Sequence, residues 1–133
     1  MNEKRLFALR GATQCLNNQD DIQKQVLGLY DELVLKNDLS ENDLVSVFFS
    51  VTRDLDAKNP ATTLRQEGRV LNTSLFVTQE AHFTGSLERV IRVIIHCYLR
   101  EKRTPFHVYR NGAEVLRPDR GKSDETLPVE AVQ

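Results

Sequence analysis

This sequence of 133 residues has little of what marks a specialised class of protein. It contains no apolar run long enough to span a bilayer, and residues 1–5 lack the apolar core of a signal peptide. It also has no excess of charge, because 18 basic side chains are matched by 19 acidic ones and the net charge is −1. That balance gives no reason to expect a polyanion or a membrane surface as a partner. We therefore expect a cytoplasmic protein that binds neither nucleic acid nor a membrane.

Cysteine is scarce too, and the cysteines that are present form no pattern. Cys15 and Cys97 lie far apart and in different contexts, so they predict neither a disulfide framework nor a metal-ligand pair. We expect both to be free thiols. The three histidines, His82, His96 and His107, match no metal-ligand spacing either. The sequence therefore predicts no metal site.

The rest of the composition is that of an ordinary globular domain. Hydrophobic residues make up 40% of the chain and charged residues 28%, as in most soluble proteins. A chain of this length can bury one substantial core but not two. Beyond Pro118 the sequence becomes polar and loses its apolar period. We expect one domain over residues 1–119 and a flexible tail over residues 120–133.

Apolar spacing predicts one long helix and about five strands. Within residues 20–36, Ile22, Val26, Leu29 and Leu33 recur at helical spacing, which indicates an amphipathic helix. Short helical segments are expected at residues 40–43, from a capping-box pattern, and at residues 60–65, where Asn59 precedes Pro60. The expected strands are residues 6–9, which end at a turn on Gly11, residues 44–51, 75–78 and 90–99, and a closing hairpin of residues 106–109 and 114–116 around Asn111 and Gly112.

Two of these strands indicate a sheet with apolar residues on both faces. Residues 44–51 form a continuous β-branched and aromatic run, typical of a strand that is covered on both sides. Within residues 90–99, alternation puts Arg92 and His96 on one face and Val93 and Cys97 on the other. One long helix cannot cover such a sheet. We therefore expect several copies of the chain to assemble.

Five groups of short segments, taken in their order and spacing, resemble the active site of a known family. They are residues 10–13, residues 50–57 with 60–61, residues 79–80, residues 91–93, and residues 107–109 with 115–119. The resemblance is to the small, monofunctional, trimeric α+β class of chorismate mutases, and it covers roughly residues 5–119. It implies an α+β fold, a mixed sheet of about five strands packed with one long helix, and a homotrimer with a barrel-like core and sites at the subunit boundaries.

The chemistry that this resemblance implies can be argued from charge. Chorismate rearranges to prephenate within one molecule, without a nucleophile, a metal, a cofactor or a proton transfer. The catalyst must hold a dianion in its compact form and stabilise negative charge that develops on the breaking ether oxygen. Arginine suits both tasks, because the guanidinium group is always charged and its fork matches carboxylates.

Three residues are implied to be catalytic. Arg92 would donate to the ether oxygen and to a substrate carboxylate, Arg10 would bind a carboxylate, and Glu80 would accept a hydrogen bond from the ring hydroxyl and balance the local charge. The alternatives are structural. Arg92 could be a strand arginine paired with a carboxylate such as Glu88, Arg10 a solvated residue just after a strand, and Glu80 a surface glutamate paired with a lysine.

Four further residues are implied to bind the substrate. Tyr109 would offer its hydroxyl to a carboxylate, and Arg65 would reach into the site of a neighbouring subunit; the alternatives are a plain half-buried strand tyrosine and a solvated helix arginine. Val77 and Leu116 complete the set, with Val77 standing where family members place a cysteine near the substrate hydroxyl. A thiol is a weak donor, so this replacement should tune binding rather than abolish it.

Two other departures from the family pattern concern the mobile lid that covers the pocket. Asn59 and Thr62 stand where the best-matched members have an aromatic residue and a lysine beside Pro60, so the lid should close with different contacts.

Two alternative functions remain open. The first is a non-catalytic trimer that binds a small dicarboxylate as a regulator. The second is a structural interaction domain. The presence of all five charged or polar site positions argues against the first, and the second leaves Arg10, Glu80 and Arg92 without a reason.

Overall fold

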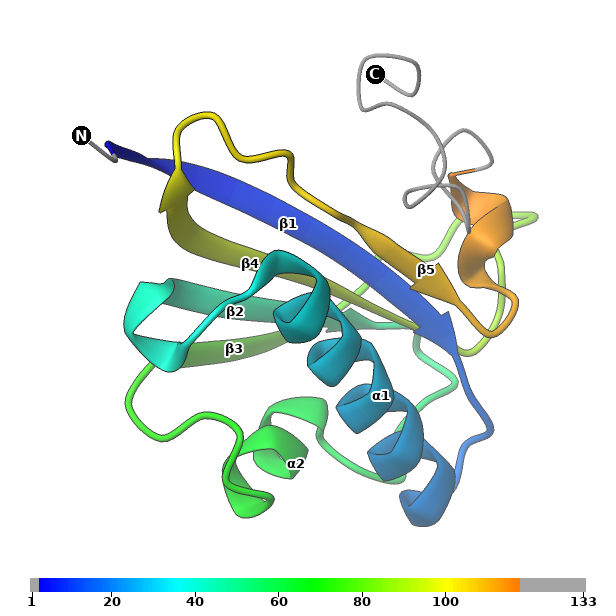
Figure 1. Ribbon diagram of the computed structural model, residues 1–133. Helices are drawn as coiled ribbons and strands as arrows, with labels where there is room; N and C mark the ends of the chain where they lie inside the picture. The colour runs from blue at the N-terminus through cyan, green and yellow to red at the C-terminus, as the bar shows by residue number, and fades with distance from the viewer. Residues whose placement is uncertain (1–2, 118–133) are drawn as a thin grey trace.

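The computed structural model describes residues 3–117, so the predicted tail at residues 120–133 lies outside the described residues (Figure 1). The expected α+β fold is confirmed. Five strands form one mixed sheet in the order β3-β2-β4-β1-β5. The strands are β1 (Lys4–Gln14), β2 (Leu44–Val51), β3 (Ser74–Gln79), β4 (Val90–Arg100) and β5 (Val108–Arg110). The helices are α1 (Gln19–Asn37) and α2 (Pro60–Gln66), with single helical turns η1 (Glu41–Asp43) and η2 (Ala113–Leu116).

The sheet is antiparallel at its centre and parallel at both edges. The central strand β4 pairs antiparallel with β1 on one side and with β2 on the other. Each edge strand then pairs parallel with its inner neighbour, β3 with β2 and β5 with β1. The loop between β2 and β3 contains α2, which makes this connection long enough for a parallel crossover.

The long helix begins and ends where its sequence provides caps. The Asn18 side chain accepts a hydrogen bond of 2.7 Å from the Asp21 backbone N–H, and the acidic first turn suits the positive end of the helix dipole. At the other end Asp38 adopts a left-handed conformation, with φ of 52°. The expected helix at residues 20–36 is therefore confirmed. The expected cap on α2 is confirmed too, because Asn59 accepts from Ala61 and Thr62.

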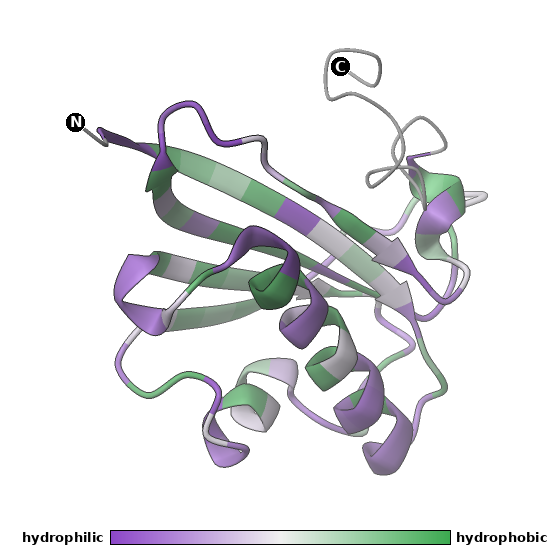
Figure 2. Cartoon of the chain, in the orientation of Figure 1, coloured by the Kyte–Doolittle hydropathy of each residue, from purple (hydrophilic) through white to green (hydrophobic). Residues whose placement is uncertain are grey.

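Both helices cover the same face of the sheet (Figure 1). Their apolar residues and those of the covered sheet face form one buried cluster, and Figure 2 shows hydrophobic and hydrophilic residues alternating along the strands. The alternation expected in β4 is confirmed, since Val93 and Cys97 are buried in that cluster while Arg92 points to the other side. Within residues 3–117 no helix is long and apolar enough to cross a membrane.

Within residues 3–117, neither α1 nor α2 covers the second face of the sheet, and only the helical turn η2 packs on one end of it, against Val90 and Tyr109. We call this side the open face. Here Phe48 on β2 is 46% exposed, Phe76 on β3 is 58% exposed, and Tyr98 on β4 is 46% exposed. The expectation that residues 44–51 are covered on both faces is therefore wrong for a single chain. Apolar residues are present on both sides, as expected, but among the described residues nothing covers Phe48, Phe76 and Tyr98 in one copy as the helices cover the other side.

The sequence predicted that β1 ends at a turn on Gly11 and that residues 106–109 form a hairpin. Both predictions are wrong, because β5 pairs parallel with β1 at Gly11. The strand β1 does not stop at Gly11 but runs to Gln14. Gly11 is needed for close approach instead: a Cβ at this position would lie 2.9 Å from the Val108 carbonyl oxygen and 3.0 Å from a Leu29 methyl group. The strand beside Gly11 is β5, which pairs with β1 rather than forming a hairpin.

The expected hairpin also fails at its second strand. Asn111 and Gly112 do form a turn with positive φ, at 57° and 99°. The following residues, Ala113–Leu116, then form the single helical turn η2 instead of a strand. Ala113 and Leu116 pack there with Tyr109 and Val90 in a second, smaller apolar cluster. This packing buries their apolar side chains more fully than an isolated two-stranded hairpin could.

Candidate active site

A cavity of about 310 Å³ lies on the open face of the sheet. Strand register explains how it forms: Arg92 on β4 is paired with Ala12 on β1 and with Ser50 on β2, Ser50 is paired with Thr78 on β3, and Ala12 is paired with Tyr109 on β5. One row of residues thus crosses all five strands. The side chains that line the cavity include Arg10, Phe48, Ser50, Thr78, Arg92 and Tyr109. Three of the predicted site residues, far apart in sequence, therefore meet at one cavity.

Arg92 forms an ion pair with Glu80. Arg92 Nε lies 2.8 Å from Glu80 Oε1, and the same carboxylate oxygen accepts a hydrogen bond of 3.1 Å from Ser50 Oγ. The Arg92 side chain is 45% exposed and the Glu80 side chain 20%. The carboxylate that accompanies Arg92 is thus Glu80 and not Glu88, which lies 3.6 Å from Arg89 instead.

Sequence reasoning missed Ser50 as a partner of this pair. Ser50 lies directly opposite Arg92 in the β2–β4 ladder, and it bonds to the carboxylate that holds Arg92. Alternation within the expected strand at residues 44–51 would have put Ser50 on the same face as Ser46 and Phe48. Only the register between the strands identifies Ser50 as a neighbour of Arg92.

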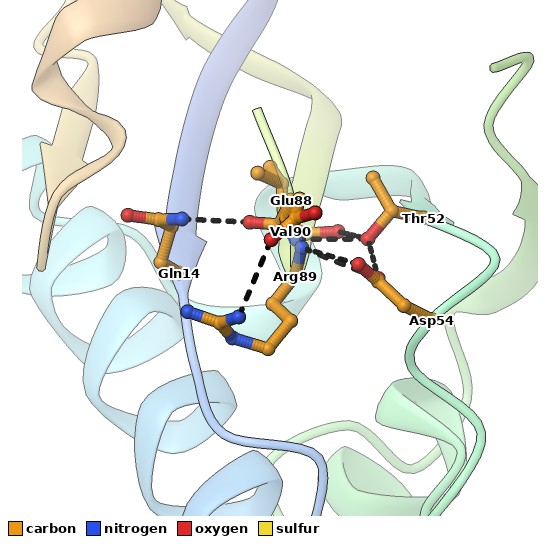
Figure 3. Close-up of polar contacts among 6 residues, drawn as sticks. All are labelled: Gln14, Thr52, Asp54, Glu88, Arg89 and Val90. Carbon is orange, nitrogen blue, oxygen red and sulfur yellow. Dashed lines mark hydrogen bonds and ion pairs between the residues drawn. The ribbon is translucent and has the colours of Figure 1, made fainter. Parts of the chain in front are cut away.

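The start of β4, two residues before Arg92, is fixed by a polar network that Figure 3 shows. Thr52 accepts a hydrogen bond of 2.9 Å from the Val90 N–H and donates one of 2.6 Å to Asp54. Asp54 in turn accepts from the Arg89 N–H at 3.0 Å, and Gln14 donates to the Glu88 carbonyl at 2.7 Å. The network holds Arg89 at a left-handed φ of 51°. It thereby sets the direction in which β4 enters the sheet.

Arg10 lies within β1 and not just after a strand, so that expectation is wrong. Its side chain is half-buried and lines the cavity. Its backbone N–H donates to Nδ1 of His107 over 3.0 Å. His107 is buried, and it lies immediately before β5 rather than within it.

Tyr109 is buried to 8% exposure on β5, a strand of only three residues. Contacts around that strand compensate for its length. Asn37 at the end of α1 bonds to both the N–H and the carbonyl of Phe106, each at 2.9 Å. Arg110 pairs with Glu32 of α1 at 3.1 Å. The strand that carries Tyr109 is thus held both before and after this residue. Leu116 packs with Tyr109 in the smaller apolar cluster.

Arg65 and Val77 do not reach this cavity in one chain. Val77 is aligned with Phe49 in the β2–β3 ladder, and its side chain packs against the main core on the helix-covered side. Arg65 is exposed on α2, the helix whose residues Ala61 and Leu64 belong to that same core. The structure therefore separates the predicted site residues into two groups on opposite faces of the sheet.

The cysteines and histidines form no alternative site. Cys15 and Cys97 are free, as expected, and burial raises the pKa of each thiol to about 11. His96 forms a hydrogen bond with Ser46 Oγ at 3.0 Å. Among residues 3–117, no group of three or more histidine, cysteine, aspartate or glutamate side chains could hold a metal ion.

Comparisons with known proteins agree with one another. The family model for chorismate mutase type I matches residues 6–120. Chorismate mutase AroH from Bacillus subtilis (strain 168) is 29% identical over 113 residues, which cover 84% of this chain and 89% of that protein. Chorismate mutase AroH from Thermus thermophilus is 35% identical over 120 residues, which cover 84% of this chain and 95% of that protein.

A solved structure agrees with these sequence matches. The chorismate mutase from Clostridium thermocellum superposes with a TM-score of 0.76 at 41% identity, and the match covers 82% of this chain and 98% of that one. The similarity therefore extends over nearly the whole of each relative, so it is not confined to one motif.

Proposed function

This chain belongs to the chorismate mutase type I family, and from that premise we propose that it rearranges chorismate to prephenate in the cavity lined by Arg10, Arg92 and Tyr109. One observation carries the choice of site: Arg10, Arg92 and Tyr109 line one cavity, and Glu80, although not part of its lining, forms an ion pair with Arg92. The reaction is an isomerisation, in which an ether C–O bond breaks and a C–C bond forms within the same molecule. The chain is thus an isomerase, and it acts in aromatic amino acid biosynthesis.

Arg92 is the residue to which we assign most of the rate. Its guanidinium would donate to the ether oxygen, where negative charge grows as the C–O bond breaks, and so would bind the transition state more tightly than the substrate. Glu80 engages Nε, so the terminal nitrogens of Arg92 would be the donors to the substrate. The ion pair fixes the fork of the guanidinium before the substrate arrives, which lowers the reorganisation that the reaction requires.

Arg10, Glu80 and Tyr109 would bind and orient the dianion. Arg10 and the Tyr109 hydroxyl would each bind a substrate carboxylate, and Glu80 would accept a hydrogen bond from the ring hydroxyl. Leu116, next to Tyr109 in the smaller apolar cluster, would contact the ring of the substrate. None of these residues needs to transfer a proton. We propose that neither metal nor cofactor is required, so adding a chelator should leave the rate unchanged.

The direct test is the loss of chorismate absorbance when purified protein is added. Arg92→Lys keeps the charge but loses the planar fork, so we expect kcat to fall by roughly two to three orders of magnitude. Arg10→Lys is the matched control, and it should act mainly on KM because its carboxylate contact exists in substrate and transition state alike. No turnover by the wild-type protein would instead favour the non-catalytic dicarboxylate binder. A near-normal kcat for Arg92→Lys would overturn the role assigned to it.

We also propose that the active form is a homotrimer in which the open faces meet. The exposed rings of Phe48, Phe76 and Tyr98 support this, because so large an apolar surface favours association over exposure to water. The separation of the site residues supports it as well. Arg65 and Val77 lie on the helix-covered side, so they could join Arg10 and Arg92 only if they came from another copy.

Subunit mixing tests the shared site. An Arg65→Ala chain and an Arg92→Ala chain should each be inactive or nearly so. In an equal random mixture of trimers, about one quarter of the sites would combine an intact Arg92 from one chain with an intact Arg65 from the next. Activity should therefore reappear on mixing. If mixed trimers form but no activity returns, Arg65 does not serve a neighbouring site. Cytoplasmic location remains a prediction that fractionation of the source cells would test.

A further inference from the structure

His107 connects the two backbone segments that carry Arg10 and Tyr109. It lies two residues before Tyr109, and its Nδ1 is 3.0 Å from the backbone nitrogen of Arg10, a residue 97 positions earlier in the chain. His107 is only 6% exposed. The bond is therefore a long-range contact that is partly shielded from water, and its donor residue, Arg10, lines the cavity together with Tyr109.

The chemistry of this bond fixes the state of the imidazole. A backbone N–H can only donate, so Nδ1 of His107 must be the unprotonated acceptor nitrogen. The position of the bond is also informative. The ladder between β1 and β5 starts at the pair of Gly11 and Val108, so the Arg10 N–H lies one residue before the first backbone partner. The imidazole takes the place that a carbonyl of a longer β5 would occupy, and it satisfies a donor that is costly to leave unpaired.

The bond has a geometric effect on the site. It extends the contact between β1 and the β5 segment by one residue, to the residue whose side chain enters the cavity. Without it, the backbone of Arg10 would be held on this edge only by its neighbours in β1. The direction of the guanidinium relative to the Tyr109 hydroxyl would then be less well defined.

We propose that His107 is a positioning residue for substrate binding, which acts through the amide of Arg10 and contacts no substrate atom itself. This proposal rests on the proposed function, because it takes Arg10 and Tyr109 as the groups that bind carboxylates. The neutral imidazole of His107 holds Arg10 and Tyr109 at the separation that the dianion requires. The cost of losing it should appear in binding, since the Arg10 contact exists in both substrate and transition state.

Two amide variants test the position of the acceptor. In His107→Asn the side-chain oxygen can lie near the place of Nδ1, whereas in His107→Gln it lies one bond further out. We expect His107→Gln to raise KM by about tenfold with kcat little changed, as for the loss of one hydrogen bond, and His107→Asn to stay within about threefold of wild type. Equal effects of the two variants, or a fall in kcat at unchanged KM, would overturn the proposal.

A second measurement needs neither variant nor turnover. In ¹⁵N NMR of the wild-type protein, Nδ1 of His107 should have the shift of an unprotonated ring nitrogen, and the Arg10 amide should exchange slowly with solvent. A protonated Nδ1 or a fast-exchanging Arg10 amide would overturn the proposal even if the protein is an active mutase. Conversely, these NMR results with no turnover of chorismate would contradict the proposed function and leave the bond established.

Discussion

The strands β3 and β5 form the two edges of the sheet, and before each of them one polar side chain from outside the sheet makes several hydrogen bonds to the backbone. At the β5 edge, Asn37 bonds to the N–H and the carbonyl of Phe106 and to the Leu33 carbonyl. At the β3 edge, the Glu41 carboxylate accepts hydrogen bonds from three consecutive backbone N–H groups, those of residues 71–73, and from the Thr73 hydroxyl. Both side chains thus hold the segment that leads into an edge strand.

The two clamps differ in burial and in charge. Asn37 is fully buried and cannot titrate. Glu41 is charged and lies at the surface, and its hydrogen bonds, first from the Asn72 N–H and then from Thr73 and Leu71, hold its pKa below the usual value. A buried neutral amide leaves unpaired backbone groups when it is removed, whereas water can replace an exposed carboxylate. The β5 edge should therefore be costly to break, and the β3 edge should depend on pH.

The largest effect is expected from Asn37→Leu, which removes the β5 clamp. It leaves the N–H and the carbonyl of Phe106 without their partner in a partly buried place, so unfolding in urea should show a loss of about 2 to 4 kcal/mol. Asn37→Asp should not rescue the clamp, because it keeps an acceptor for the Phe106 N–H but puts a buried carboxylate against the two carbonyl oxygens to which the amide donated. A cost below about 1 kcal/mol for the leucine variant would mean that Asn37 is not the clamp.

A smaller effect on the same edge is expected from Gly11→Ala. The added Cβ would lie 2.9 Å from the Val108 carbonyl and 3.1 Å from a Leu33 methyl group, so β5 and α1 must both shift. Such overpacking costs about 1 to 3 kcal/mol, and KM should rise because Tyr109 moves with β5. Gly68→Ala is a comparison at an open site, where no atom lies within 4 Å and only its φ of 72° resists the change. Equal KM values for the two variants would contradict this view of the β5 edge.

Removing the β3 clamp should have a local effect. In Glu41→Gln one acceptor oxygen remains but the charge is lost, so the amides of residues 71–73 should exchange faster with solvent while the global stability changes less than in Asn37→Leu. Glu41→Ala should speed that exchange further. Amide exchange followed by NMR measures this directly. Unchanged exchange at residues 71–73 in both variants would exclude Glu41 as the clamp of this edge.

The smallest effect is the dependence of the β3 edge on acid. The pKa of Glu41 is lower in the folded state than in the unfolded one, so its contribution is fully present above the unfolded pKa and is lost as pH falls through the folded pKa. Between these values, exchange at residues 71–73 should accelerate relative to exchange at Phe106, whose partner Asn37 does not titrate. In Glu41→Gln this relative change should disappear. Its persistence there would point to another carboxylate, such as Asp43, whose pKa is also lowered.

The elements that could be predicted from sequence are those whose patterns are local. The helix at residues 20–36 and the strands at residues 44–51 and 90–99 were expected because apolar period and caps lie within each segment, and all three are confirmed. The role of Gly11 was not predictable, because it depends on Val108, a residue that is distant in sequence. For the same reason the predicted pairing of residues 106–109 with residues 114–116 was wrong, because the partner of so short a strand depends on contacts distant in sequence.

The site divides in the same way. Arg10, Arg92 and Tyr109 could be named from the resemblance, and they do meet at one cavity. Ser50 and the pairing of Glu80 with Arg92 could not, since both depend on the register between β2 and β4 and on where β3 ends. The positions of Arg65 and Val77 relative to that cavity depend on a second copy, which a single chain does not contain.

The strand order has a consequence for how the chain acquires its structure during synthesis. The first strand, β1, has both of its partners, β4 and β5, in the last third of the described chain. The backbone N–H and C=O groups of β1 therefore cannot pair with these strands until about a hundred residues have left the ribosome. Such non-local pairing slows folding and leaves an unpaired strand available to other chains in the meantime. The helix α1, which follows β1 directly and covers its apolar side, is then the only early protection that β1 receives from the residues described here.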